Sequence, residues 1–230
     1  MTNEKSQRQT DGSEGDQSSS VTIYLADDHA MVREGLASLL ASDDNKFAVI
    51  GQSGDGLAVL SDVKRLQPHV VVLDITMPGL NGLDVCRDIV RLCPRTNVLI
   101  LSMHSDAQFI VRAIEYGATG YLLKESATTQ LHEAVSSVAG GTLYLGPGIP
   151  LDILEQVTKS HDDPYERLTS RERQVFQLIA EGKTNRNIAE KLDLSVKTVD
   201  THRMRLMNKL DIHDHISLVK YALRKGIVTI

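Results

Sequence analysis

The regular alternation of short apolar runs with amphipathic segments is the feature that most restricts the fold of this chain. Over residues 21–139, five runs rich in β-branched residues each precede a segment whose apolar residues have helical spacing. The pairs are VTIYLADD with MVREGLASLL, FAVIGQS with GLAVLSDVKRL, HVVVLDI with GLDVCRDIVRL, NVLILSM with DAQFIVRAIEYG, and GYLLKE with TTQLHEAVSSVAG. Strands that alternate with helices form a parallel sheet covered on both faces. The pattern predicts an α/β domain with a doubly wound, five-stranded parallel sheet.

The rest of the chain has a different pattern. Residues 140–167 combine a Gly/Pro-rich stretch, GTLYLGPGIP, with the helically spaced LDILEQVTK, which indicates a linker with one short helix. Residues 168–230 hold four helical stretches and predict a second, all-α domain. Within it, Thr169 and Glu172 have the spacing of a capping box, and Gly182 and Gly226 are expected to end helices. Residues 1–20 are polar and predict a disordered tail.

Charge is distributed unevenly between the two predicted domains. Residues 168–230 contain 12 lysines and arginines against 7 aspartates and glutamates, a net charge of +5, whereas the preceding 167 residues carry −10. A basic surface suits a polyanionic partner, although uneven surface charge alone is an alternative. No apolar run approaches the roughly 18 residues of a membrane helix, so we expect a cytoplasmic protein with no membrane partner. Cys86 and Cys93 are too far apart on one helix for a disulfide and are expected to be core or surface thiols.

Polar residues follow the predicted strands where each strand ends. Asp74 interrupts the apolar stretch HVVVLDITMPG, and a carboxylate there is costly unless it meets a cation or a hydrogen-bond donor. Asp27 and Asp28 follow the first strand, Ser102 ends the fourth, and Lys124 follows the fifth. In doubly wound folds these ends lie at one edge of the sheet. The three carboxylates would repel one another, and aspartate oxygens are good Mg²⁺ ligands, so the sequence predicts a magnesium site.

The same group of residues indicates phosphoryl chemistry. Neither GxxxxGK[ST] nor GxGxxG occurs in the sequence, which disfavours a nucleotide-dependent enzyme. Beside a metal ion, a carboxylate can act as a nucleophile toward phosphorus. A fixed lysine and a hydroxyl can stabilise the oxygens of the transferring group.

These motifs resemble those of the two-component response regulators of the NarL/FixJ type. The resemblance covers residues 21–230. Its receiver motifs are the Asp27-Asp28 pair, LDITMPGLNG, LSMH and GYLLKE, and its LuxR-type output motif is LTSRERQVFQLIAEGKTNRNIAEKLDLSVKTVDTHRMRLMNKL. The resemblance implies a flavodoxin-like receiver domain followed by a helix-turn-helix DNA-binding domain.

The resemblance also implies roles for the strand-end residues. Asp74 would accept a phosphoryl group from a sensor histidine kinase. Mg²⁺ would be bound directly by Asp28 and Asp74, through water by Asp27, and by the backbone carbonyl of Thr76. The alternative for Asp27 and Asp28 is that they cap the helix that begins near Ala30.

Three further residues would respond to the phosphoryl group. Lys124 would pair with its oxygens, Ser102 would hydrogen-bond it, and Tyr121 would turn inward as a switch. The alternatives are a solvated lysine, a satisfied hydroxyl and an ordinary half-buried strand tyrosine. Thr76 and His104 are expected to flank the phosphoryl position, and Pro78-Gly79 fits a type II turn beside the acceptor.

The stretch TNRNIAEKLDLSVKTVDTHRMRLMNKL has the layout of a helix-turn-helix motif, with Ser195 as the expected N-cap of its second helix. Helical spacing places Val199, His202 or Arg203, Leu206 and Leu210 inward, and Lys197, Asp200, Thr201 and Met204 outward. The resemblance implies base contacts from Asp200, Thr201 and Met204. By the same resemblance, the residues available for DNA phosphates are Lys197, Thr198, Arg203, Arg205 and Lys209. Thr184 and Asn185 could add contacts to the DNA backbone through their side chains and N–H groups.

Several of these assignments have alternatives. Asp200 departs from relatives that carry lysine there, and its carboxylate can only accept a hydrogen bond, for instance from cytosine N4. A basic helix on its own is more often a solvated face than a DNA-binding element. His202 is expected to be a buried structural histidine. In the last helix the apolar residues Ile216, Leu218, Val219, Ala222 and Leu223 are interpreted as a dimer contact by resemblance, or as ordinary core packing.

Together these features predict a non-enzymatic response regulator. Phosphorylation of Asp74 would release a restraint on the helical domain and favour binding of a homodimer to promoter DNA with two half-sites. One alternative is a regulator that works without phosphorylation. A less favoured alternative is a Mg²⁺-dependent phosphatase or phosphotransfer enzyme.

Overall fold

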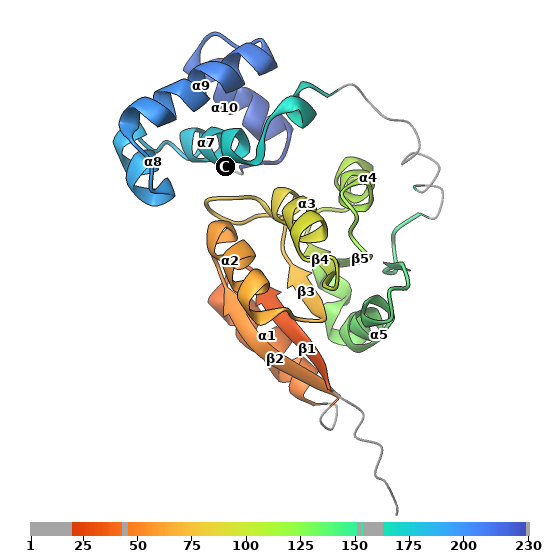
Figure 1. The fold of residues 1–230 in the computed structure, drawn as a ribbon. Coiled ribbons are helices and arrows are strands. Elements are labelled where there is room, and N and C mark those ends of the chain that lie inside the picture. Colours follow the sequence, from red (N-terminus) through yellow and green to blue (C-terminus); the bar gives the residue numbers. More distant parts are fainter. Residues whose placement is uncertain (1–19, 43–45, 151–152, 154–162, 229–230) are drawn as a thin grey trace, which may run out of the picture.

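The structure is a computed structural model that describes residues 20–42, 46–150, 153 and 163–228. They form an α/β unit and a helical unit (Figure 1). The predicted tail lies outside the described residues apart from residue 20, and so does most of the predicted linker helix. No helix among the described residues is long and apolar enough to cross a membrane.

The sheet of the α/β unit is parallel throughout, with the strand order β2-β1-β3-β4-β5-β6. Its strands are β1 (Val21–Ala26), β2 (Phe47–Ser53), β3 (Val70–Leu73), β4 (Asn97–Ser102), β5 (Gly120–Leu123) and β6 (Tyr144–Leu145). The doubly wound α/β prediction and all five predicted strands are confirmed. The short strand β6, which falls in the predicted linker, is an addition, because two residues carry no readable strand pattern.

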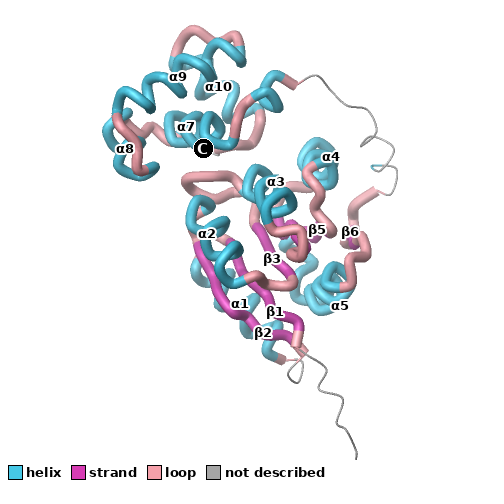
Figure 2. Tube along the Cα trace, in the orientation of Figure 1, coloured by secondary structure: helices cyan, strands magenta, loops and turns pink. Residues whose placement is uncertain are grey.

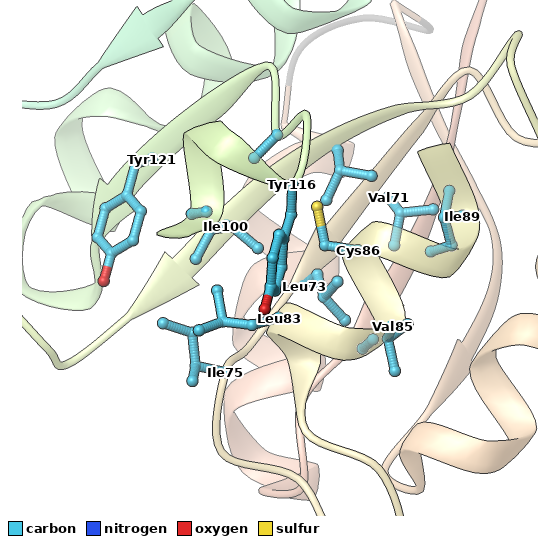
Figure 3. Packing of buried hydrophobic residues seen from close by; sticks show 14 of the residues in the cluster. Val71, Leu73, Ile75, Leu83, Val85, Cys86, Ile89, Ile100, Tyr116 and Tyr121 are labelled. Carbon is cyan, nitrogen blue, oxygen red and sulfur yellow. The ribbon is translucent and has the colours of Figure 1, made fainter. Parts of the chain in front are cut away.

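Helices cover both faces of this sheet (Figure 2). They are α1 (Ala30–Ala41), α2 (Gly56–Leu66), α3 (Gly82–Leu92), α4 (Ala107–Glu115) and α5 (Ala127–Ala139), with the 3₁₀ turn η1 (Lys124–Ser126) before α5. Alternate residues of β3 enter different apolar clusters: Val71 and Leu73 pack with α2, α3 and α4, whereas Val70 and Val72 pack with α1 and α5. Figure 3 shows the first cluster. Burial on both faces explains why the strand sequences are continuously apolar.

The two cysteines lie on the inner side of α3 and just after it. Both thiols are free and buried. Burial raises the pKa of the Cys86 thiol to about 12. Cys86 is therefore a core residue with little thiolate character.

The helical unit contains η2 (Pro164–Arg167), α7 (Ser170–Ala180), α8 (Asn185–Leu192), α9 (Val196–Leu210) and α10 (His215–Arg224). Thr169 and Glu172 form the predicted capping box, and the Ser195 hydroxyl accepts a hydrogen bond from the Thr198 N–H as the N-cap of α9. Gly182 and Gly226 follow the ends of α7 and α10 with positive φ. The turn η2 falls in the predicted linker but belongs to this unit, because Tyr165 is fully buried in its core.

Candidate functional site

Asp27, Asp74 and Lys124 meet at the carboxyl edge of the sheet. Each follows the last residue of its strand: β1, β3 and β5 end at Ala26, Leu73 and Leu123. Lys124 Nζ lies 2.6 Å from Asp27 Oδ2 and 2.9 Å from Asp74 Oδ2. Asp27 and Asp74 are only 1% and 4% exposed. Lys124 therefore provides the cation that a buried Asp74 carboxylate needs.

The buried environment shifts the pKa values of this group. Burial raises the pKa of Asp74, and the facing Lys124 ammonium offsets part of that increase. Burial alone would lower the pKa of Lys124, but the Asp27 and Asp74 carboxylates oppose it and the net pKa is raised. Lys124 therefore remains charged between the two carboxylates.

Asp28 and His29 form the more exposed side of the same edge. His29 Nδ1 lies 2.6 Å from Asp28 Oδ1 and 3.5 Å from Asp27 Oδ1. Ligand atoms of these three residues lie within 4.8 Å of one another. The N-cap of α1 is His29 and not an aspartate, so the capping alternative does not account for the pair, although Asp27 Oδ1 accepts the His29 N–H. Carboxylate oxygens grouped in this way suit a hard divalent cation such as Mg²⁺.

His104 connects the residues expected to respond to phosphorylation. Its N–H donates to Ser102 Oγ at 3.1 Å, and its carbonyl accepts the Tyr121 hydroxyl at 2.7 Å. Its ring nitrogen Nε2 lies 3.4 Å from Thr76 Oγ1, and the ring stacks on Phe109 with centroids 4.3 Å apart. Tyr121 is fully buried and points inward, which excludes the half-buried alternative.

The loop after Asp74 is tightly constrained. Gly79 has φ +82°, which suits the third position of the expected Pro-Gly turn, and the Gly56 N–H donates to the Pro78 carbonyl at 3.0 Å. A Cβ added at Gly82 would lie 1.8 Å from the backbone oxygen of Asp74. Sequence reasoning did not single out Gly82, since a glycine at a helix start has many explanations.

This loop is also held by the helical unit. Gln177 on α7 donates from Nε2 to the Met77 carbonyl at 2.8 Å and accepts the Asn81 N–H on Oε1 at 2.6 Å. Glu181 Oε1 accepts the Gly79 N–H at 2.8 Å. The loop beside Asp74 therefore shares three hydrogen bonds with the other unit.

A buried polar cluster extends this contact to α3 and η2. Arg173 Nη1 lies 2.7 Å from Asp84 Oδ1, and the Tyr165 hydroxyl donates to Asp84 Oδ2 at 2.5 Å. Glu166 accepts from the Tyr116 hydroxyl and pairs with Arg87 at 3.0 Å. None of these residues was predicted from the sequence, because each is an ordinary polar position in its own helix or turn.

The outward residues of α9 are open to solvent on the side of the helical unit away from the sheet (Figure 1). Lys197, Asp200, Met204 and Arg205 are exposed, and Met204 is 62% exposed. Val199, Leu206 and Leu210 face inward as predicted, and His202 and Arg203 are both half-buried. Burial lowers the pKa of His202, which is typical of a structural histidine.

Several of the proposed DNA-contact residues already have partners within the helical unit. Asp200 Oδ1 accepts from Asn185 Nδ2 at 2.5 Å, and Thr201 Oγ1 donates to the Lys197 carbonyl. Thr184 and Ser195 are N-caps, the latter also within 2.7 Å of the Thr198 hydroxyl.

The structure also bears on the expected phosphate contact of Lys209 and on the expected dimer contact of α10. Lys209 Nζ lies 2.6 Å from Glu172 Oε2 and donates to the Arg167 carbonyl. On α10, Leu218 and Ala222 are buried in the core, whereas Ile216 is 67% exposed and Val219 and Leu223 are half-buried. The helix thus has a core side and an additional apolar residue on its surface.

Comparison with known proteins finds two family models along the chain. Residues 23–136 match the family model of the response regulator receiver domain, and residues 166–222 match that of bacterial regulatory proteins of the luxR family. The oxygen regulatory protein NreC of Staphylococcus carnosus is 37% identical over 214 residues, covering 90% of this chain and 98% of NreC.

Two solved structures of RcsB are also similar. RcsB of Salmonella enterica serovar Typhimurium, bound to promoter rprA in the presence of the phosphomimetic BeF3⁻, is 27% identical with a TM-score of 0.53. The match covers 87% of this chain and 98% of that one. A structure of two RcsB dimers bound to two parallel DNAs is 26% identical with a TM-score of 0.53, covering 91% of this chain and 100% of that one.

Proposed function

Because this chain belongs to the DNA-binding two-component response regulators with a receiver domain and a LuxR-type output domain, we propose that Asp74 is its phosphorylation site. The observation that carries the proposal is the position of Asp74, which is buried at the carboxyl edge of the sheet with Lys124 Nζ at 2.9 Å, while the same ammonium lies 2.6 Å from Asp27. We propose a receiver domain and an output domain close to the predicted limits of 21–139 and 168–230, with β6 (Tyr144–Leu145) added to the receiver and η2 (Pro164–Arg167) to the output domain.

In the proposed reaction Asp74 attacks the phosphorus of a phosphohistidine on a sensor kinase. The phosphorus–nitrogen bond breaks, an aspartyl phosphate forms, and the histidine leaves with the electron pair of the broken bond. Mg²⁺, which the receiver family uses for phosphorylation, would be held by Asp28, Asp74 and the Thr76 carbonyl, with Asp27 through water, and would neutralise charge on the transferring oxygens. Lys124 stays charged and is placed to pair with the same oxygens.

Ser102 and Tyr121 would transmit the change. Ser102 Oγ accepts a hydrogen bond from His104, and Tyr121 donates one to the same residue. If Ser102 turns to the phosphoryl group, the loop at His104 moves with it and Tyr121 changes its partner. The phosphoryl group shifts this equilibrium only by the extent to which it binds the active arrangement more strongly.

The output would be binding of a homodimer to promoter DNA. The exposed face of α9 would enter the major groove, with Asp200, Thr201 and Met204 at base edges and Lys197, Thr198, Arg203 and Arg205 near phosphates. Thr184 and Asn185 at the start of α8 would add contacts to the DNA backbone. Lys209 could bind a phosphate only after its ion pair with Glu172 breaks. The solved structures of RcsB dimers bound to DNA and of RcsB bound to promoter rprA support the binding of a dimer to promoter DNA.

The proposal is tested by mass spectrometry of the intact protein after incubation with acetyl phosphate. We expect one Mg²⁺-dependent phosphoryl adduct on the wild type, none with EDTA, and none on Asp74→Asn. An adduct of equal yield on Asp74→Asn would place the site elsewhere. If phosphorylated wild type and Asp74→Asn bound promoter DNA equally well, the phosphorylation-independent alternative would hold instead.

A further inference from the structure

The DNA-binding domain supplies part of the support for the loop that follows Asp74. Gln177 is 1% exposed, and both ends of its side-chain amide bond to the receiver backbone, at Met77 and Asn81. Glu181, one turn later at the C-cap of α7, accepts from Gly79. A buried amide whose donor and acceptor are both satisfied by one loop restrains the conformation of that loop.

The restrained loop is continuous with the acceptor. Met77, whose carbonyl accepts from Gln177, directly follows Thr76, whose carbonyl is the proposed metal ligand. At the other end the Gly82 N–H donates to the Ile75 carbonyl at 2.8 Å, and Gly82 packs against the Asp74 carbonyl. Because peptide groups are planar, turning the Thr76 carbonyl toward a metal also moves the backbone of Met77.

In the docked arrangement the Ser102 and Tyr121 hydroxyls share one partner residue. Ser102 and Tyr121 are both hydrogen-bonded to His104 while α7 holds the loop. The outward residues Lys197, Asp200 and Met204 of α9 are exposed in this same arrangement. When α7 is docked, the outward face of α9 therefore stays exposed to solvent. What docking contacts instead is the loop that follows Asp74.

We propose that Gln177 is a positioning residue of the phosphorylation site, acting from the DNA-binding domain by holding the Met77–Asn81 loop, so that a movement of the Thr76 carbonyl toward a metal ion works against the docked contact. This inference rests on the proposed function of Asp74. Binding of a divalent cation at the carboxylates and docking of α7 then oppose each other. Because coupling between two binding events is reciprocal, metal weakens docking as much as docking weakens metal binding.

The test is the affinity of the full chain for Mn²⁺, followed by the electron paramagnetic resonance signal of the free ion. Gln177→Met keeps an unbranched side chain of similar size but removes both hydrogen bonds to the loop. Its matched control is Gln174→Met on the same helix, since Gln174 accepts from Arg171 within the DNA-binding domain. We expect Gln177→Met to bind Mn²⁺ about five-fold more tightly than wild type, from the usual net strength of a hydrogen bond. Gln174→Met should be unchanged.

A second measurement examines the reverse direction in the wild type. Added Mg²⁺ should accelerate hydrogen exchange at the Gly79 and Asn81 amides, which donate to Glu181 and Gln177. If Gln177→Met folds poorly, Glu181→Ala serves instead, because Glu181 is half-buried and its removal frees the Gly79 N–H. Unchanged or weaker Mn²⁺ binding in these variants would overturn the proposal.

The two proposals fail in different ways. Absence of a phosphoryl adduct on the wild type would contradict the function proposed for Asp74, whatever the Mn²⁺ titration shows. A normal adduct with equal Mn²⁺ affinity in wild type and Gln177→Met would contradict only the role of Gln177. Absence of Mn²⁺ binding to the wild type would overturn the inference on Gln177 directly.

Discussion

Arg173 and Asp84 form a buried ion pair between the two domains, with Arg173 Nη1 2.7 Å from Asp84 Oδ1 and each side chain 3% exposed. Tyr165 and Asn81 also donate to the carboxylate of Asp84, so both of its oxygens are satisfied. Buried pairs are costly to break from one side, because the remaining charge lacks a partner. The Arg173–Asp84 pair therefore helps to hold α7 of the output domain against α3 of the receiver.

Arg173→Met should separate the domains. Removing the guanidinium leaves Asp84 buried and uncompensated while the domains are docked, at a cost of about 3 kcal/mol, and undocking returns it to water. We expect a larger radius of gyration by small-angle X-ray scattering. Arg171→Met is the control, because Arg171 bonds to Gln174 and the Leu192 carbonyl inside its own domain. Scattering curves that superpose on the wild type would show that the pair does not determine docking.

Gly82→Ala should disrupt the acceptor site. The new Cβ would lie 1.8 Å from the Asp74 carbonyl oxygen, and that atom is backbone, so the strand end and α3 must move apart. We expect a decrease of about 3 kcal/mol in the free energy of unfolding, as for severe overpacking, measured by urea denaturation.

Gly35→Ala is the matched control for Gly82→Ala. Gly35 lies in α1, and a Cβ there has no heavy atom within 4 Å. Alanine in a helix interior is favoured over glycine by roughly 0.5–1 kcal/mol, so this variant should be slightly more stable than wild type. Equal effects of the two substitutions would contradict the close approach at Gly82.

The fold was predictable because each element has a local signal. Continuously apolar, β-branched runs such as residues 70–73 indicate strands buried on both faces, and the intervening helices are amphipathic. β6 was missed because two residues have no periodicity. η2 was assigned to the linker because its Pro164 and polar neighbours resemble a loop, whereas the single residue Tyr165 attaches it to the helical core.

The strand-end residues were predictable for a topological reason, and the interdomain residues were not. In a parallel sheet the positions after each strand converge, so Asp27, Asp74 and Lys124 had to lie near one another. Gln177 meets Asn81 across 96 positions of sequence, and this contact depends on how two domains dock. The sequence pattern of α7 shows which of its residues are polar, but it does not show which residues of the other domain they contact.

Glu172→Gln should lower stability at neutral pH by about 1 kcal/mol. Burial alone would raise the pKa of Glu172, but Lys209 and the Thr169 N–H lower it by more, so the folded pKa lies below the ordinary value of about 4.3. The carboxylate therefore stabilises the fold above that value, and the stabilisation is lost as pH falls through the folded pKa. Glutamine keeps the capping geometry and removes the charge.

The measurement is the free energy of unfolding of wild type and Glu172→Gln from neutral pH to about pH 3. The two curves should converge in acid. Glu190→Gln provides the control, because the Arg186–Glu190 pair is 84% and 70% exposed and contributes little. A constant difference between wild type and Glu172→Gln across this range would exclude the charge of Glu172 as its cause.

Arg205→Ala should weaken DNA binding more than Lys209→Ala does. Arg205 is exposed on α9 and makes no ion pair with a described residue, so its charge is available to a phosphate. Lys209 is engaged by Glu172 at 2.6 Å and by the Arg167 carbonyl, and a phosphate contact would require breaking both interactions. Removing one side chain that binds a DNA phosphate reduces the slope of log affinity against log salt by about one.

Fluorescence anisotropy with duplex DNA at several salt concentrations measures that slope. We expect a reduction for Arg205→Ala and an unchanged slope for Lys209→Ala, whereas the opposite order would place Lys209 at the phosphate backbone.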